Sequence, residues 1–442
     1  MPGGPKTGYA LAVLFAINAV NFFDRQILPA LGEPIRREWG LSDAELGALG
    51  TAFTLLYAFA GVPLGRLADR ASRTRILSVG VLAWSLLTGL SGLARGFWQL
   101  FALRLGVGVG EAACAPAATS LIGDLFPPER RARALSVFML GLPFGIAASY
   151  AVSSAIAQAW GWRSAFLLAA LPGFVCAAAA LLVAEPPRGL AEAGAVGARR
   201  REGSAYRLVL SIPTMWWLIL SGAVHNFNMY AISSFLSPYL MRFHGAALRE
   251  AGFLSMLVYG VGGGIGLLAG GAAADAAVRR RADGRLLVAT GAILASLPLL
   301  HLALVRPRGD ALAFTALIGG ACLLMYVYYP AVYAAIQDVI EPALRGTAMA
   351  LYFLAMYVLG ASLGPVGTGL LSDHLTARAA RAAGVIEVTP QALEPFRAAG
   401  LQAAMEILPL LGLALTLLLF AASRTAPRDR RRLEAWMRDS TP

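Results

Sequence analysis

The sequence predicts an all-α membrane protein with twelve transmembrane helices arranged as two pseudo-symmetric six-helix bundles. Three observations support this fold class: the apolar composition, the number of long apolar stretches, and a weak repeat between the two halves of the chain. Of the 442 residues, 58% are hydrophobic and only 14% are charged, whereas soluble domains carry roughly 25% charged residues. This apolar content exceeds what a water-soluble core needs, so the bilayer is the expected solvent.

Apolar stretches long enough to cross a bilayer occur throughout the chain. About 20 mainly apolar residues are required for one crossing. The first stretch is too long for the apolar region of a signal peptide and contains Asp24 and Arg25, so we interpret it as the first membrane helix. The twelve stretches lie near residues 9–31, 43–65, 75–94, 97–122, 133–158, 163–184, 212–240, 250–273, 286–305, 311–337, 346–372 and 398–423.

The basic residues predict the orientation. Twelve crossings place both termini on one side, and about two thirds of the 37 lysines and arginines fall on that side. Positively charged short loops remain cytoplasmic. We therefore expect a multi-pass protein of the plasma (inner) membrane with both termini in the cytoplasm.

A polar segment at 185–210 divides the chain. It begins with E-P-P-R-G and is the longest predicted cytoplasmic linker. We therefore predict an N-terminal bundle at 1–184 and a C-terminal bundle with a basic cytoplasmic tail at 211–442. Two local repeats between the halves support this division, as in transporters built from duplicated bundles. The repeated pairs are Gly65 with Gly271, Asp69 with Asp275, Arg73 with Arg279, Arg75 with Arg281, Pro128 with Pro342, and Arg131 with Arg345.

Several functional classes are disfavoured. The formal charge of +12 is spread over many short loops, without the aromatic-interleaved basic domain of a nucleic-acid binder. The four histidines form no H-E-x-x-H pair, and no serine or cysteine occupies a recognisable nucleophile elbow. The cysteines lie in apolar stretches and suggest neither a disulfide framework nor a metal site: they are Cys114, Cys176 and Cys322. We therefore expect no enzyme, no cofactor and no resident metal.

A signature segment joins the second and third spans. Residues 65–75 read G-R-L-A-D-R-A-S-R-T-R and closely resemble the cytoplasmic loop motif of the major facilitator superfamily. The resemblance implies that this loop packs against the N-terminus of the eleventh span, where an acidic side chain is stabilised, and latches the two bundles together. An alternative is that these charges only fix the topology. The residues assigned to the latch are Gly65, Asp69, Arg70, Arg73 and Arg345.

Three further segments resemble the Spinster subfamily of that superfamily. They are N-F-F-D-R-Q at 21–26, R-L-G-V-G-V-G-E-A-A-C-A-P at 104–116 and G-D-L-F-P-P-E-R-R-A-R-A at 123–134. The resemblance extends over about the first 185 residues. It implies a proton-linked carrier or exporter of lysolipid-like or sphingolipid-like amphiphiles.

Four ionisable residues lie deep inside apolar spans. Asp24 and Arg25 lie in the first span, and Arg104 and Glu111 lie in the fourth. Charged side chains are costly there and normally face a cavity or a partner, so all four are functional candidates. Arg104 and Glu111 share one helix face but lie roughly 10 Å apart along it, so we expect Arg104 to contact Asp24 instead.

Glu111 is the candidate proton carrier, and Asp24 is the competing one. Burial disfavours an ionised carboxyl group and a neighbouring arginine favours it, so a change of conformation can switch the protonation state. The alternative is that the four residues form a permanent structural ion-pair network. Arg25 and Arg104 are the candidates for binding an anionic headgroup.

The seventh and tenth spans supply further substrate-binding candidates. The superfamily resemblance implies that spans one, four, seven and ten line a central cavity. His225 and Asn226 lie near the middle of the seventh span, and Tyr326, Tyr329 and Tyr333 share a face of the tenth. The tyrosines can hold a cationic headgroup over their rings or can be packing residues. His225 can bind substrate or a proton or can be a buried bundle histidine.

These observations predict a secondary active transporter, coupled to protons, that moves an amphiphilic lipid-like or anionic substrate by alternating access. A drug or organic-anion carrier of the same fold is the close alternative, and a non-transporting membrane receptor is the remote one. The expected partners are the lipid bilayer, a small-molecule or lysolipid- or sphingolipid-like substrate, and protons. We expect a monomer that binds no nucleic acid.

Overall fold

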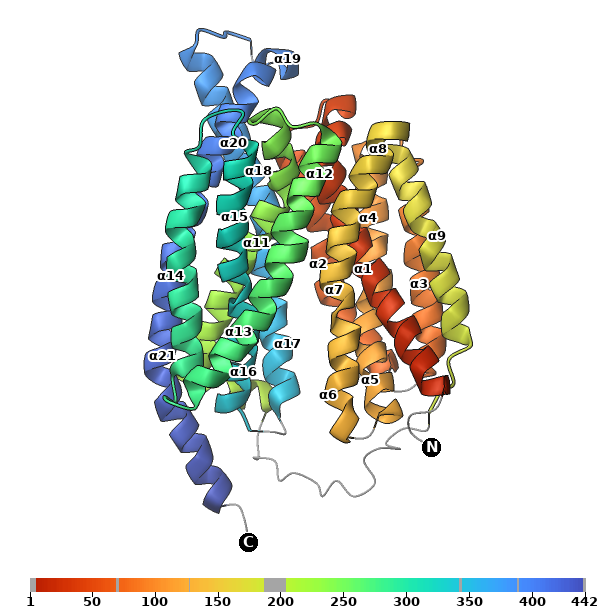
Figure 1. Cartoon of the computed structure of the whole chain (residues 1–442), viewed down its shortest axis with the longest axis vertical. Helices are drawn as coiled ribbons and strands as arrows, with labels where there is room; N and C mark the ends of the chain where they lie inside the picture. Colours follow the sequence, from red (N-terminus) through yellow and green to blue (C-terminus); the bar gives the residue numbers. More distant parts are fainter. Residues whose placement is uncertain are drawn as a thin grey trace.

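The computed structural model describes residues 5–68, 71–126, 128–186, 204–341, 344–387 and 389–439. All regular structure in these ranges is helical, which confirms the predicted all-α class. Figure 1 shows long helices that run side by side along one axis. Large apolar side chains remain exposed, among them Leu268 and Leu312 at 76% and 75%, as expected for a surface in contact with hydrocarbon.

The first six predicted spans are all helical. The first, second, third and sixth are single helices, whereas one break at Ala113 interrupts the fourth, and a break at Leu140 and a π-helical segment interrupt the fifth. In chain order the helices are α1 (Pro5–Trp39), α2 (Asp43–Ala68), α3 (Arg73–Ser91), α4 (Phe97–Ala112), α5 (Cys114–Leu125), α6 (Pro128–Met139), α7 (Gly141–Ala148), the π segment Ser149–Ser153, α8 (Ser154–Trp160) and α9 (Trp162–Leu181).

The second six spans follow the short helix α10 (Ala205–Leu210). Here π-helical segments interrupt the eighth and eleventh spans. The helices are α11 (Pro213–Arg242), α12 (Leu248–Met256), the π segment Leu257–Gly262, α13 (Gly263–Val278), α14 (Gly284–Leu304), α15 (Ala311–Tyr326), α16 (Tyr328–Val339), α17 (Arg345–Ala355), the π segment Met356–Ala361, α18 (Leu363–Ala382), α19 (Pro390–Leu393), α20 (Arg397–Met405) and α21 (Ile407–Asp439).

The seventh span differs from the others in polarity. Eleven helical segments of the described ranges are long and apolar enough to cross a membrane. α11 is not among them, although it is 30 residues long, because its middle contains His225, Asn226 and Asn228. Most of its residues are nevertheless buried, and it packs against α1, α18 and α21. With α11 as the seventh span, the observed helices agree with the predicted twelve.

Both ends of the described chain lie at the same end of the molecule. α1 begins and α21 ends there, at the bottom of Figure 1, and we call it the termini end. The opposite end, where α1 ends and α2 begins, is the far end. α1 to α9 lie on one side of the molecule and α11 to α21 on the other. We call these the N-half and the C-half; the boundary at 185–210 stays a prediction, because residues 187–203 lie outside the described ranges.

Glycines permit the closest helix approaches. A Cβ atom on Gly145 would lie 2.2 Å from the carbonyl oxygen of Ala19, and one on Gly266 would lie 2.2 Å from that of Leu323. These glycines bring α7 against α1 and α13 against α15. Small residues of this kind hold membrane helices together because they let the backbones touch.

Candidate functional site

A cavity of about 800 Å³ lies between the two halves, near the middle of the membrane helices. Most of its lining side chains are apolar or aromatic, and its charged groups all come from the N-half. The structure places seven of the sequence-predicted residues in its wall: Asp24, Arg25, Arg104, Asn226, Tyr326, Tyr329 and Tyr333. The wall has an ionic part on α1 and α4 and an aromatic part on α15 and α16.

Arg25 connects the cavity to Glu111. Its Nε donates a 2.8 Å hydrogen bond to Oε2 of Glu111, and the two side chains are 7% and 0% exposed. The guanidinium carbon also lies 4.3 Å from the ring centre of Tyr57 and 5.0 Å from that of Phe53, distances at which a cation is attracted to an aromatic face. Arg25 lines the cavity, whereas Glu111 lies behind it.

The close packing of α4 on α2 sets this geometry. Gly108 lies one turn before Glu111, and a Cβ atom there would be 2.5 Å from the carbonyl oxygen of Phe53. Because the two backbones touch at this point, Glu111 of α4 and the rings of Phe53 and Tyr57 on α2 surround the same guanidinium. A side chain at position 108 would separate the two helices.

Asp24 and Arg104 are connected through Thr88 of α3. The Thr88 hydroxyl donates a 3.2 Å hydrogen bond to Oδ2 of Asp24 and accepts one of 3.3 Å from Nη2 of Arg104, which also donates to Ser91 at 2.9 Å. Within the described ranges no ion pair joins Asp24 directly to Arg104. The expected contact between them is therefore indirect.

Both candidate proton carriers have an unused carboxylate oxygen. Oδ1 of Asp24 and Oε1 of Glu111 are buried and accept no hydrogen bond from any described residue. A buried carboxylate oxygen without a donor is unfavourable for the ionised group. Each carboxyl group therefore has a position at which it can hold a proton.

Tyrosine rings form the C-half wall of the cavity. The ring centres of Tyr326 and Tyr329 are 5.7 Å apart, and those of Tyr329 and Tyr333 are 5.8 Å apart. The Tyr329 hydroxyl donates to Oδ1 of Asn226 at 3.3 Å. The three tyrosines predicted to share a helix face thus line the cavity with adjacent rings, together with the amide of Asn226.

His225 lies behind this wall and does not line the cavity. Its ring stacks on Tyr328 with a centroid distance of 3.9 Å and meets Tyr329 edge-on at 4.9 Å. Neither ring nitrogen has a hydrogen-bond partner among the described residues. A direct contact with substrate would require Tyr329 to move.

A buried ion network closes the far end between the two halves. Arg242 of α11 lies 2.6 Å from Glu33 of α1 and 2.7 Å from Asp43 of α2, and all three are at most 4% exposed. Arg36 of α1 lies 2.6 Å from Glu394, in the segment before α20. These contacts join the N-half to the C-half at one end of the cavity.

Asp373 of α18 adds a helix cap to this network. Its carboxylate accepts backbone hydrogen bonds from Asp43 at 3.0 Å and from Ala44 at 2.8 Å, in the first turn of α2. A carboxylate is stabilised at the positive N-terminus of a helix. Arg397 of α20 lies 3.4 Å from the same carboxylate, so the cap and the ion pairs form one assembly.

The predicted latch falls at the termini end. Gly65 lies in α2, Arg345 is exposed at the start of α17, and Asp69 and Arg70 lie outside the described residues. Arg73 is fully buried. Its described partners belong to the N-half: Asp124, Glu185, the hydroxyl of Ser120 and the carbonyl of Pro186.

Glu185 fixes the start of α3 after the sixth span. Its carboxylate lies 2.7 Å from Nε of Arg73 and accepts a 2.9 Å hydrogen bond from the backbone of Thr74. Partial burial opposes ionisation, but the backbone donor at Thr74 and the Arg73 guanidinium outweigh it. The pKa of Glu185 therefore falls from 4.5 to about 2.

Sequence reasoning missed the far-end network. Glu33 and Arg36 lie beyond the predicted end of the first span at residue 31, although α1 continues to Trp39. Charged residues near span ends are usually solvated at the interface, so composition alone does not distinguish a buried network from a surface one. An acid and a base spaced three residues apart on one helix, as in Glu33 and Arg36, were the one available signal.

Comparisons with known proteins agree with this architecture. The family model of the Major Facilitator Superfamily matches residues 14–365. An "MFS-type efflux pump" of Mycolicibacterium smegmatis is 32% identical over 84% of this chain and 86% of its own length. "Protein spinster homolog 3" of Homo sapiens is 31% identical over 84% of this chain and 76% of its own length.

A solved structure extends the likeness to three dimensions. It is the crystal structure of a bacterial homolog of the human lysosomal transporter Spinster in an inward-facing, unoccupied conformation. It superimposes with a TM-score of 0.83 and 28% identity, covering 97% of this chain and 99% of that one. The chain therefore belongs to the major facilitator superfamily and is a membrane transporter that resembles the Spinster proteins.

Proposed function

We propose that the chain is a proton-coupled carrier that moves an amphiphilic, anionic or lipid-like substrate across the membrane by alternating access. The observation that carries this proposal is the position of Arg25, which lines the cavity and is bonded to the buried Glu111. One guanidinium therefore meets both the substrate in the cavity and the proton site at Glu111.

The coupling follows from competition for Arg25. An anionic headgroup that enters the cavity draws the guanidinium away from Glu111. A buried carboxylate that loses its partner is an uncompensated charge, which costs several kcal/mol, and a proton removes that cost. Substrate binding and proton binding at Glu111 therefore favour each other, and the linkage is reciprocal. Asp24 is the second proton site, coupled through Thr88 to Arg104.

The shape of the cavity supports an amphiphile. Its charged groups, Asp24, Arg25 and Arg104, lie on the N-half, and most of the remaining wall is apolar or aromatic. A headgroup can meet the two arginines while an acyl chain contacts the rest of the wall. A small hydrophilic anion would leave that wall against water, which is unfavourable.

The closed far end supports an inward-facing state. Buried ion pairs of Arg242 and Arg36 join the halves there, and the chain superimposes on an inward-facing relative. We propose that the termini end faces the cytoplasm, with the protein in the plasma (inner) membrane. In the opposite state the far-end network separates, and the loop at 65–75 with Arg345 latches the termini end.

A drug or organic-anion carrier is the second candidate. The relative in Mycolicibacterium smegmatis is named an efflux pump, and the rings of Tyr326, Tyr329 and Tyr333 can stack on an aromatic or cationic drug. This function would use the C-half wall more than Arg25.

Transport by the purified chain in liposomes tests the proposal. The substrates are lysophosphatidylglycerol, lysophosphatidylcholine, a water-soluble organic anion and a cationic dye, each with and without an imposed proton gradient. We expect gradient-stimulated transport of the anionic lysolipid. Stronger transport of the dye or the soluble anion would favour the second candidate.

Glu111→Gln tests the coupling. We expect it to abolish stimulation by the gradient while substrate exchange between the two sides continues, because the glutamine cannot carry a proton. Glu38→Gln is the matched control, since Glu38 is an exposed far-end carboxylate bonded to Trp162 and Arg163. Full gradient stimulation in Glu111→Gln would exclude Glu111 as the proton carrier.

A further inference from the structure

A second concave site lies at the termini end, outside the central cavity. It has a volume of about 470 Å³ and is formed by the loop between α13 and α14 together with the last part of α21. Five arginines line it: Arg279, Arg280, Arg281, Arg430 and Arg431. The cavity and the far-end network use none of these residues.

The site has more positive charge than its own acids neutralise. Arg281 pairs with Asp283 at 3.0 Å, and Arg430 pairs with Glu434 at 2.9 Å. The other three arginines, on both walls, form no ion pair with any residue of the described ranges. Guanidinium groups are suited to bind phosphate oxygens, often two at a time.

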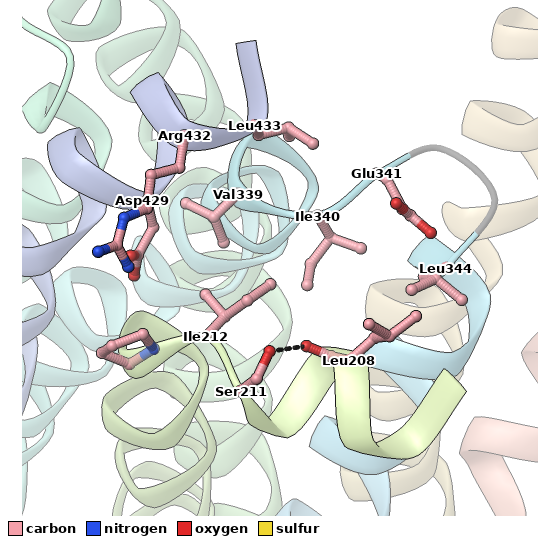
Figure 2. Close-up of a pocket in the computed structure, with 11 residues that line it drawn as sticks. Leu208, Ser211, Ile212, Val339, Ile340, Glu341, Leu344, Asp429, Arg432 and Leu433 are labelled. Carbon is pink, nitrogen blue, oxygen red and sulfur yellow. Dashed lines mark hydrogen bonds between the residues drawn. The ribbon is translucent and has the colours of Figure 1, made fainter. Parts of the chain in front are cut away.

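The α21 wall of the site is held in place from its opposite face. There Asp429 accepts hydrogen bonds from the backbone and the hydroxyl of Thr214 at 3.0 and 2.6 Å. Figure 2 shows Asp429 and Leu433 on the face that meets Ile212 and Val339. Since α21 is docked by this face, the arginines on its other face are presented to the α13–α14 loop in a fixed position.

The sequence repeat relates Arg279 of this site to Arg73 of the N-half. Arg73, the sequence counterpart of Arg279, is bound by Glu185, which follows the sixth span. In the C-half the segment that follows the twelfth span supplies Arg430 and Arg431 instead. Arg73 is thus paired within its own half, whereas Arg279 has no ion pair among the described residues and lines the site together with Arg430 and Arg431.

The site lies at the edge of the membrane. One candidate span ends at Val278 and the next begins at Gly284, so the loop joins the ends of two helices that can cross the membrane. In α21 the apolar stretch ends after the exposed Phe420, and Arg424 is the first charged residue beyond it. Arg430 lies about 9 Å further along the helix, a distance comparable to the thickness of a headgroup layer.

We propose that this basic pocket binds the phosphate-bearing headgroup of an anionic phospholipid from the adjacent leaflet and thereby fastens α21 to the α13–α14 loop. Basic pockets at the cytoplasmic ends of membrane helices are suited to such headgroups. A free phosphate offers the same oxygens, but only a lipid also places its acyl chains against the exposed apolar faces of α13 and α21, at Leu268 and Leu417.

Native mass spectrometry of the delipidated full chain tests this site without requiring transport. The probe lipids are phosphatidylglycerol and phosphatidylcholine with identical acyl chains. We expect phosphatidylglycerol to bind at least about tenfold more tightly. Three arginines of the site form no ion pair with a described residue, and we replace all of them by serine (Arg279→Ser, Arg280→Ser, Arg431→Ser). This should remove most of the preference, since each basic residue strengthens binding to anionic lipid roughly fivefold at a membrane surface. Replacing the same three by lysine should retain part of it, because the charge remains although the two-pronged geometry of the guanidinium is lost.

A matched control removes three exposed arginines elsewhere at the termini end. The substitutions Arg130→Ser, Arg133→Ser and Arg207→Ser cause the same loss of charge, and we expect the preference for phosphatidylglycerol to remain. Equal losses in the two serine variants, or a loss in the lysine variant as large as in its serine counterpart, would overturn the proposal. Displacement of the lipid by inorganic phosphate or glycerophosphoglycerol at similar concentration would also overturn it, since the site would then bind free anions.

Discussion

Arg242 and Asp43 meet across the two halves at the far end, where Nη1 lies 2.7 Å from Oδ1 and 3.0 Å from Oδ2. Both side chains are buried, at 4% and 0% exposure. Removing one partner of a buried ion pair leaves the other charge uncompensated, at a cost of about 3–5 kcal/mol. We therefore expect Arg242→Gln to shift the population toward the state in which the far end is open.

Electron paramagnetic resonance with spin labels at Trp160 and Leu312, exposed far-end positions in the N-half and the C-half, measures this shift. The label distance should lengthen in Arg242→Gln. Arg163→Gln is the control, because Arg163 pairs with Glu38 in a contact that is exposed and lies within the N-half. An unchanged distance distribution in Arg242→Gln would show that the network does not hold the far end closed.

Thr88 should act as part of the Asp24–Arg104 unit. Thr88→Val removes the hydroxyl that bonds to both side chains, and loss of such buried hydrogen bonds costs about 1–3 kcal/mol. We expect transport to fall about tenfold with an altered pH profile, as in Asp24→Asn. The double variant should be little worse than either single one, because residues of one network are not additive.

Liposome uptake at a series of pH values measures this coupling. Thr119→Val is the control, since the hydrogen bonds of the Thr119 hydroxyl to described residues go to carbonyl groups of its own helix. If the double variant loses as much uptake as Thr88→Val and Asp24→Asn together, the two residues act separately.

Two glycines of α13 should respond differently to alanine. A Cβ atom on Gly266 would lie 2.2 Å from the backbone oxygen of Leu323, whereas one on Gly264 would meet no atom within 4 Å. We expect Gly266→Ala to lower the melting temperature by several degrees, because α13 and α15 must separate. Gly264→Ala should leave it unchanged or raise it slightly, since alanine favours the helix by up to about 1 kcal/mol.

Thermal unfolding in detergent, followed by intrinsic fluorescence, compares the two variants. Both variants replace glycine by alanine on the same helix, two residues apart, so the change in helix propensity is the same in each. Equal melting temperatures would show that the approach of α13 to α15 is looser than the structure indicates.

Glu185 should stabilise the chain above the acidic range. Partial burial raises its pKa, but the hydrogen bonds from the Thr74 backbone and from Arg73 lower it by more. The pKa therefore falls from 4.5 to about 2 in the folded chain. A depressed pKa gives stability that is fully present above about pH 4.5 and is lost as the pH falls toward 2. Glu185→Gln should therefore lower the melting temperature at pH 7, and the difference from the parent should shrink between pH 4.5 and 2.

Melting curves from pH 2 to 7 test this dependence. Glu434→Gln is the control, because Glu434 forms an exposed pair with Arg430 on α21, and such pairs contribute little. A difference for Glu185→Gln that stays constant over the whole pH range would contradict a role for the ionised carboxylate.

The fold was predictable from the sequence because its signals are local. Apolar stretches of about 20 residues gave the spans, and even the polar α11 was recognisable from its position and length. The ionisable residues were also recognisable, since Asp24, Arg25, Arg104 and Glu111 stand out in apolar surroundings.

Their partners were not predictable, because they depend on how helices rotate and approach. Arg25 meets Glu111, which is 86 positions away in sequence, only because Gly108 brings α4 onto α2. In the sequence Thr88 is an ordinary residue of an apolar span; only the packing of α3 places it between Asp24 and Arg104. His225 lies behind Tyr329 for the same reason: spacing indicated a shared depth but not which side chain faces the cavity.

The polarity of α11 also affects how the chain enters the membrane during synthesis. A segment with His225, Asn226 and Asn228 at its centre partitions poorly into lipid by itself. In the finished fold α21, which is made after α11, covers part of it, and Asn228 donates a hydrogen bond to the carbonyl of Leu408 there. Stable insertion of α11 therefore depends on α21, so a ribosome stalled before residue 407 would leave the polar side chains of α11 uncovered and the chain exposed to quality-control proteases.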